Sequence, residues 1–253
     1  MTLKRTEYTY WEEYIGRKGT EMSEKQYRGL SILMTVLLLF SSFFIGREVA
    51  VFTMAGNVKT AEKCVVLDAG HGGADPGKVG VNGVEEKTIN LEIVKKVKKY
   101  LEASDVRVVL TRENDEGPEG DQIKNKKVQD MRRRVEVIEN SHPDAVISIH
   151  QNSFPQESVH GAQVFYYTGS DKGQKLATRI QSTVTRYADI GNQRQIKAND
   201  SYYLLKKTSV PIVIVECGFL SNWEEAEKLK TAEYQDKMAW AIALGILQYL
   251  NAG

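Results

Sequence analysis

The sequence predicts an α/β fold: a single three-layer domain with a mainly parallel, twisted sheet flanked by helices, preceded by an N-terminal transmembrane anchor. Two observations lead to this prediction. Short apolar runs alternate with amphipathic helical segments between residues 63 and 250. A stretch of 18 uncharged residues, 29–46, precedes them. We therefore expect an N-terminal segment 1–28, an anchor 29–46, a linker 47–62 and a main domain 63–251.

Composition narrows the function classes. The chain has 253 residues, of which 26% are charged, and its net charge is only +1. This balance argues against a nucleic-acid surface and against a disordered acidic tail. The two cysteines are too few for a disulfide scaffold or a cysteine-rich zinc cluster.

The uncharged run at 29–46 is just long enough to cross a hydrocarbon core of about 30 Å at 1.5 Å per residue. Lys25 and Arg28 precede it, whereas Arg47 is the one basic residue close behind it. This asymmetry predicts a cytosolic N-terminus and an exported main domain. A cleaved signal peptide that begins at Met22 and a buried core helix are the alternatives.

Three apolar runs each end at a residue that can bind a metal or move a proton. In open α/β sheets, ligands bind at the carboxyl ends of the strands, so these residues should meet at one edge. The glycines around the first histidine allow a tight turn there. The runs and the residues after them are 64–69 with His71, 145–149 with His150, and 211–215 with Glu216.

The remaining pattern alternates helices with strands. Glu86 begins an amphipathic segment, where a carboxylate is common simply because it favours the helix dipole. A histidine in a core is likewise more often hydrogen-bonded than metal-bound, and His142 and His160 lack the strand-end context altogether. The other expected elements are strands at 106–111 and 161–167, a polar loop at 113–127, and helices at 86–101, 128–140, 172–189, 223–230 and 237–250.

Seven ordered motifs resemble the zinc-dependent N-acetylmuramoyl-L-alanine amidases of the type 3 group, which cut peptidoglycan. The motifs are VVLDAGHGG, DPG, NGVEEKTINLEI, LTR, RVEVIEN, ISIHQNS and VPIVIVECGFLSN. The resemblance implies that His71, Glu86 and His150 bind Zn2+ and that Glu216 is the catalytic carboxylate. Glu86 is preferred over Glu85 because the family's glutamate directly precedes the lysine. Cys217 departs from the small aliphatic residue that is frequent in relatives.

The implied residues make chemical sense. Two imidazoles and one carboxylate give zinc three ligands and leave the fourth position for water. Zinc lowers the pKa of this water, and Glu216 can take its proton and pass it to the leaving amine. Asn152 is a candidate substrate-binding residue, with closure of the turn after His150 as its alternative role. Arg134 is expected to be a structural ion-pair partner.

Within this family, the short form with an N-terminal anchor, one catalytic domain and no wall-binding repeats is most similar to the amidases that act in sporulation. The resemblance then implies a membrane-anchored, extracytoplasmic enzyme of the cell or spore envelope, which prepares cortex peptidoglycan for muramic-δ-lactam formation and germination. A general amidase of cell separation, a zinc peptidase or deacetylase, and a wall-binding module without catalysis are the alternatives. An accessory protein partner is compatible with the sequence, which does not identify one.

Overall fold

The computed structural model describes residues 23–55, 62–115 and 123–252, with side chains for 23–42, 62–115 and 127–252. The chain divides into two compact units, residues 1–60 and 61–253. Helix α2 (Glu24–Ala55) belongs to the first and extends into the expected linker. Within the described residues, we find no helix long and apolar enough to cross a membrane. The expected anchor 29–46 lies partly outside the described side chains and stays a prediction.

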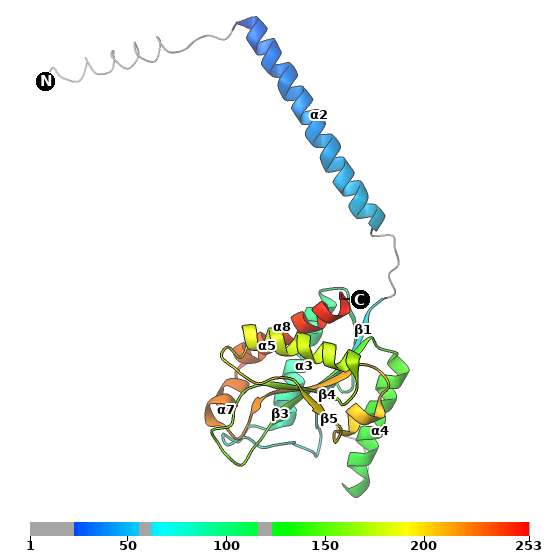
Figure 1. The fold of residues 1–253 in the computed structure, drawn as a ribbon, viewed down its shortest axis with the longest axis vertical. Coiled ribbons are helices and arrows are strands. Elements are labelled where there is room, and N and C mark those ends of the chain that lie inside the picture. The colour runs from blue at the N-terminus through cyan, green and yellow to red at the C-terminus, as the bar shows by residue number, and fades with distance from the viewer. Residues whose placement is uncertain (1–22, 56–61, 116–122, 253) are drawn as a thin grey trace, which may run out of the picture. The chain divides into compact units, whose positions relative to one another are not determined.

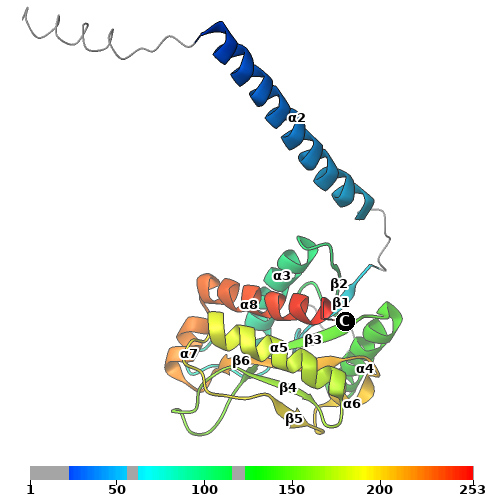
Figure 2. The same ribbon diagram turned by 45° about the horizontal axis from the view of Figure 1, so that its top comes forward.

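The second unit contains a six-stranded sheet (Figure 1). Its strand order is β2-β1-β3-β6-β4-β5, and Figure 2 labels each of these strands. All neighbouring strands run parallel except β4 and β6, so the predicted mainly parallel sheet is confirmed. Strand β5 was not expected because three residues at a sheet edge leave no apolar run. The strands are β1 (Cys64–Ala69), β2 (Arg107–Leu110), β3 (Ala145–Asn152), β4 (Gln163–Tyr167), β5 (Lys197–Asn199) and β6 (Ile212–Phe219).

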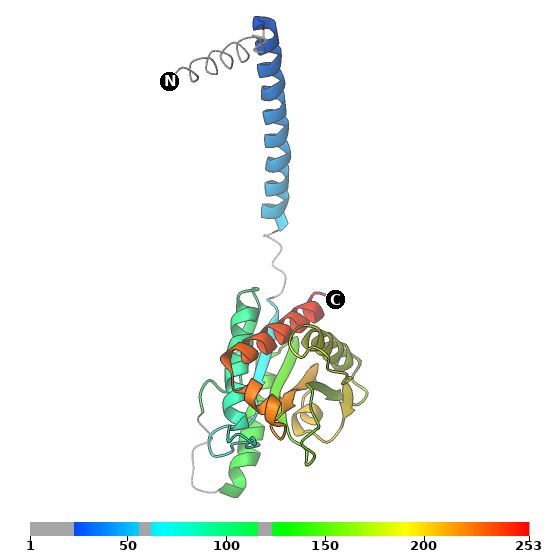
Figure 3. The same cartoon turned by 90° about the vertical axis from the view of Figure 1, so that its left-hand side faces the viewer.

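Helices cover both faces of this sheet, which confirms the three layers. Alternate strand residues explain this: Val65 and Leu67 pack with α3, α5 and α8, whereas Val66 packs with α4 and α6. Helix α8 contacts both α3 and α5 (Figures 2 and 3). The helices are α3 (Glu86–Glu102), α4 (Ile123–Ser141), α5 (Asp171–Tyr187), α6 (Tyr203–Lys207), α7 (Trp223–Leu229) and α8 (Ala232–Leu250).

Two helices begin five residues before their predicted starts, and one helix was not expected. Helix α4 begins at Ile123, inside the segment 113–127 that we expected to be a loop. Helix α8 begins at Ala232 because the Thr231 side chain accepts a hydrogen bond from the Tyr234 backbone N–H and so caps it. Helix α6 spans only five residues, too few for a helical period to show.

Candidate active site

His71 lies just beyond the carboxyl end of β1 in a left-handed backbone conformation, with φ 62°. Few residues other than glycine adopt this conformation, and here buried arginines stabilise it. Arg134 donates to the carbonyl oxygens of His71 and Ala69 at 2.6 and 2.7 Å, and Arg112 donates to that of Ala69 at 2.9 Å. These arginines therefore fix the backbone that carries the His71 side chain.

Asp68 neutralises this cluster from within β1. The side chain is 1% exposed and accepts hydrogen bonds from Thr111, Ser148 and Arg134. Burial alone would raise its pKa, but Arg134 and the two hydroxyls outweigh burial and lower the pKa to about 2. Arg134 also pairs with Asp130 at 2.7 Å. The expected role of Arg134 as an ion-pair partner is thus confirmed.

His150 comes from the neighbouring strand β3, and its imidazole lies directly against Gly70. A Cβ atom added to Gly70 would lie only 2.2 Å from Cε1 of His150, far inside any normal contact. The Gly70 N–H also donates to the Ile149 carbonyl at 3.0 Å, which ties the end of β1 to β3. A glycine is therefore required for the two histidines to lie side by side.

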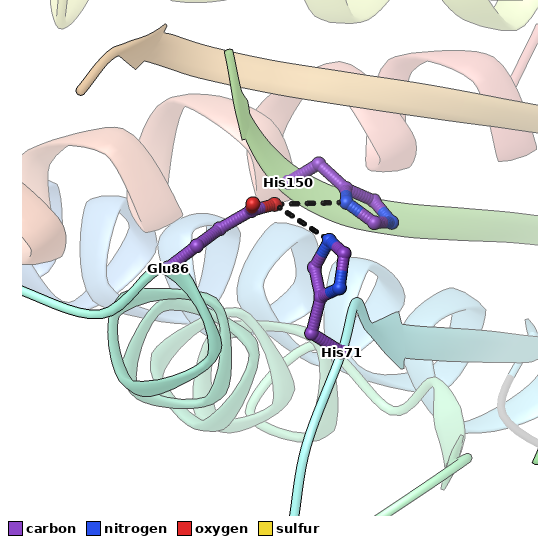
Figure 4. A group of neighbouring side chains, drawn as sticks. All are labelled: His71, Glu86 and His150. Atoms are coloured by element: carbon purple, nitrogen blue, oxygen red, sulfur yellow. Dashed lines mark hydrogen bonds and ion pairs between the residues drawn. The ribbon is translucent and has the colours of Figure 1, made fainter. Parts of the chain in front are cut away.

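Glu86 begins α3 and points between the two imidazoles, as Figure 4 shows. Its Oε1 lies 3.3 Å from Nε2 of His71 and 3.0 Å from Nδ1 of His150. Burial would raise the pKa of Glu86, but the hydrogen bonds and charges of the two histidines lower it. Glu85 instead precedes the helix and pairs with Lys87 at 3.4 Å. The structure therefore brings Glu86, and not Glu85, to the histidines.

Backbone and amide groups fix the Glu86 carboxylate further. Oε1 accepts from the Gln151 N–H at 3.0 Å and from Nδ2 of Asn90 at 3.3 Å, while Oε2 accepts from the Lys78 N–H at 2.8 Å. Asn90 also donates to the Gly70 carbonyl at 3.0 Å. The carboxylate is thus held in one orientation by groups from β3, from α3 and from the segment before α3.

The donor atoms of His71, Glu86 and His150 fit a metal ion. They all lie within 4.8 Å of one another. Ligands about 2.0–2.1 Å from a tetrahedral zinc are separated from each other by about 3.3 Å, close to the distances from Glu86 to the two rings. His142 and His160, which we did not expect to be ligands, are not members of this group. Nitrogen and oxygen donors in this arrangement suit zinc.

Asp75 contacts His71, and we did not predict this contact from the sequence. Its Oδ2 lies 3.0 Å from Nδ1 of His71, and Oδ1 accepts from the Gly77 N–H at 3.1 Å. A carboxylate on Nδ1 places the proton there and leaves Nε2 free to bind a metal. The DPG motif contains Asp75, but only the folded chain shows that it contacts His71.

Glu216 lies opposite His150 in the β3–β6 register and projects to the face covered by α4 and α6. It is 6% exposed, and burial raises its pKa despite the nearby His150. Oε1 is 3.2 Å from the Tyr202 hydroxyl, whereas Oε2 has no partner among the described residues. Cys217 packs into the core on the other face, as expected from strand alternation.

A cavity of about 940 Å³ is lined by His71, Glu86, His150 and Glu216 and reaches α4 and α6. This size suits part of a polymer substrate, since ligand pockets have about 300–1,000 Å³. Asn152 lines the cavity, and its Oδ1 accepts from the Ser153 N–H at 2.8 Å. Asn152 therefore closes the turn after β3 and also faces the cavity, and its contact with substrate stays a prediction.

Comparison with known proteins gives consistent matches. Residues 65–248 match the Amidase_3 family, described as N-acetylmuramoyl-L-alanine amidase. The germination-specific N-acetylmuramoyl-L-alanine amidase of Bacillus subtilis (strain 168) is 39% identical over 192 residues, 75% of this chain and 80% of that protein. The CwlD amidase of Clostridioides difficile, solved in complex with the GerS lipoprotein, is 40% identical with a TM-score of 0.74, covering 76% of this chain and 100% of that one. The N-acetylmuramoyl-L-alanine amidase AmiC2 of Nostoc punctiforme is 36% identical with a TM-score of 0.66, covering 76% of this chain and 98% of that one.

Proposed function

Since this chain belongs to the N-acetylmuramoyl-L-alanine amidase family, we propose that it performs this hydrolysis with zinc bound by His71, Glu86 and His150 and with Glu216 as catalytic base. Its activity is cleavage of the amide between N-acetylmuramate and L-alanine in peptidoglycan. The observation that best supports the zinc proposal is the convergence of three donor atoms within 4.8 Å beside a buried carboxylate. We assign this catalytic domain to residues 63–251.

The residues of the site divide the chemistry between them. Zinc at the three donors would supply a water of near-neutral pKa and polarise the amide carbonyl. Oε2 of Glu216, which lacks a partner among the described residues, accepts a proton from the attacking water. Glu216 then donates that proton to the nitrogen of the departing L-alanine. Burial raises the pKa of Glu216, which favours acceptance of the proton in the first of these two steps.

We further propose spore cortex as the substrate, in maturation for muramic-δ-lactam formation and germination. Support comes from the 39% identity to the germination-specific amidase of Bacillus subtilis. The test incubates the full chain with cortex and with vegetative peptidoglycan and identifies the products by mass. Preference for cortex supports the proposal, and equal cleavage of both indicates a general wall amidase.

The same digestion tests the zinc assignment. The full chain should contain about one zinc ion per molecule, lose activity on chelation and regain it with zinc. Products should carry new L-alanine amino termini and intact N-acetyl groups. Cleavage between amino acids or removal of acetyl groups would instead identify a zinc peptidase or deacetylase, and binding without products would identify a wall-binding module.

We propose that residues 29–46 anchor the enzyme in a membrane with the catalytic domain outside the cytoplasm. The 18 uncharged residues and the basic residues before them support this. The full chain should fractionate with membranes, and recovery of the uncleaved chain in the cytosol would contradict the proposal. Because CwlD was solved with the GerS lipoprotein, we also propose an envelope protein as partner, to be sought by cross-linking in cells.

A further inference from the structure

Glu216 has unusually few hydrogen bonds for a buried carboxylate. An ionised carboxylate can accept several hydrogen bonds, and buried polar groups are generally satisfied. In the described residues, the Tyr202 hydroxyl at 3.2 Å from Oε1 is the single side-chain partner of Glu216, and Oε2 has none. Removal of this one hydroxyl would therefore leave the carboxylate free to rotate.

Tyr202 is itself firmly held. It directly precedes α6, and its backbone N–H donates to Oδ1 of Asn199, at the end of β5, at 3.1 Å. Its ring meets Phe165 of β4 edge to face, with centroids 5.7 Å apart and planes at 73°. The neighbouring Tyr203 differs, since it is 42% exposed. These contacts with the sheet edge fix the position of the Tyr202 hydroxyl beside Glu216.

We propose that Tyr202 is a positioning residue, whose hydroxyl holds Oε1 of Glu216 so that Oε2 remains available for proton transfer. The inference rests on the proposed role of Glu216 as base. The terminal torsion of a glutamate is broad, so packing alone does not select which oxygen is presented. A hydrogen bond from Tyr202 to Oε1 fixes this torsion and so presents Oε2.

The test compares Tyr202→Phe with the wild-type full chain on defined muropeptides. Misplacement of a catalytic group by about 1 Å can cost about 100-fold in rate, so we expect kcat to fall by about 10- to 100-fold. KM should change by less than about twofold and zinc content should stay the same, because the hydroxyl contacts none of the three donors. The phenyl ring keeps the contact with Phe165, and circular dichroism monitors the fold.

Tyr100→Phe is the matched control. The Tyr100 hydroxyl also donates to a carboxylate, Asp236 at 3.0 Å, but it joins α3 to α8 away from the cavity. Its loss removes the same chemical group and should leave kcat and KM at wild-type values. An equal loss of kcat in both variants would overturn the positioning role.

A double-mutant cycle with Glu216→Gln distinguishes positioning from direct contact with substrate. If Tyr202 acts through Glu216, adding Tyr202→Phe to Glu216→Gln should leave the residual rate unchanged. Full additivity would overturn the proposal. A normal kcat in Tyr202→Phe, together with a strongly reduced kcat in Glu216→Gln, would refute the positioning role and leave the role of Glu216 intact. Wild-type activity in Glu216→Gln would instead refute the proposed function.

Discussion

Replacing Gly70 by alanine should strongly weaken metal binding, although the residue carries no donor. The new Cβ would lie 2.2, 2.3 and 2.6 Å from Cε1, Nε2 and Nδ1 of the His150 ring. The ring must therefore retreat by about 1 Å to reach ordinary contact, several times the tolerance of about 0.2 Å on zinc–ligand distances. The ring is also aromatic and stiff, so no flexible end can yield. We expect zinc affinity and kcat/KM each to fall by at least about 100-fold.

Gly218→Ala is the control for this variant. Its added Cβ would meet Cδ1 of Leu229 at 3.1 Å, and this end of a flexible side chain can move by a few tenths of an ångström. Competition titration with a zinc chelator, together with muropeptide hydrolysis, measures both variants. Gly70→Ala with wild-type zinc affinity and an intact fold would refute the view that glycine is needed to place His150.

Two further outcomes follow from the carboxylates. Glu86→Gln should weaken zinc binding by more than about 100-fold, because even the loss of a residue that only hydrogen-bonds a metal ligand costs about 10–100-fold. Glu85→Gln should bind zinc like wild type in the same titration. The reverse pattern would assign the ligand to Glu85. The folded-state pKa of Asp68 is lowered from 3.8 to about 2. Its stabilising effect is therefore complete at about pH 5 and is lost as the pH falls through 3.8 towards 2. Urea unfolding should show wild type losing on the order of 2 kcal/mol through this group between about pH 5 and pH 2. This component should be missing in Asp68→Asn, and identical pH slopes would contradict it.

The strand-end residues could be predicted because buried parallel strands leave a plain sequence pattern. Apolar runs bounded by glycine or by a polar residue located His71, His150 and Glu216. Parallel strands then required their carboxyl ends to lie at one edge. Glu86 needed the family motif, because a glutamate at a helix start has an ordinary explanation in the helix dipole.

The supporting residues could not be predicted because their contacts depend on distances between separate segments. Asp75 contacts His71 only through the left-handed turn at the end of β1. Tyr202 precedes a helix of five residues and follows a strand of three, so neither period was visible around it. The start of α4 at Ile123 was missed because the residues before Val128 are mostly polar.

The central claim is that His71, Glu86 and His150 bind zinc, whereas Glu216 transfers the proton and is not a ligand. Zinc content and muropeptide hydrolysis should be measured together for Glu216→Ala and His150→Ala in the full chain. We expect Glu216→Ala to retain about one zinc ion per molecule and to release no L-alanine amino termini, whereas His150→Ala should lose both zinc and activity. Loss of zinc in Glu216→Ala with the fold intact, or its retention in His150→Ala, would contradict this assignment of ligand and base.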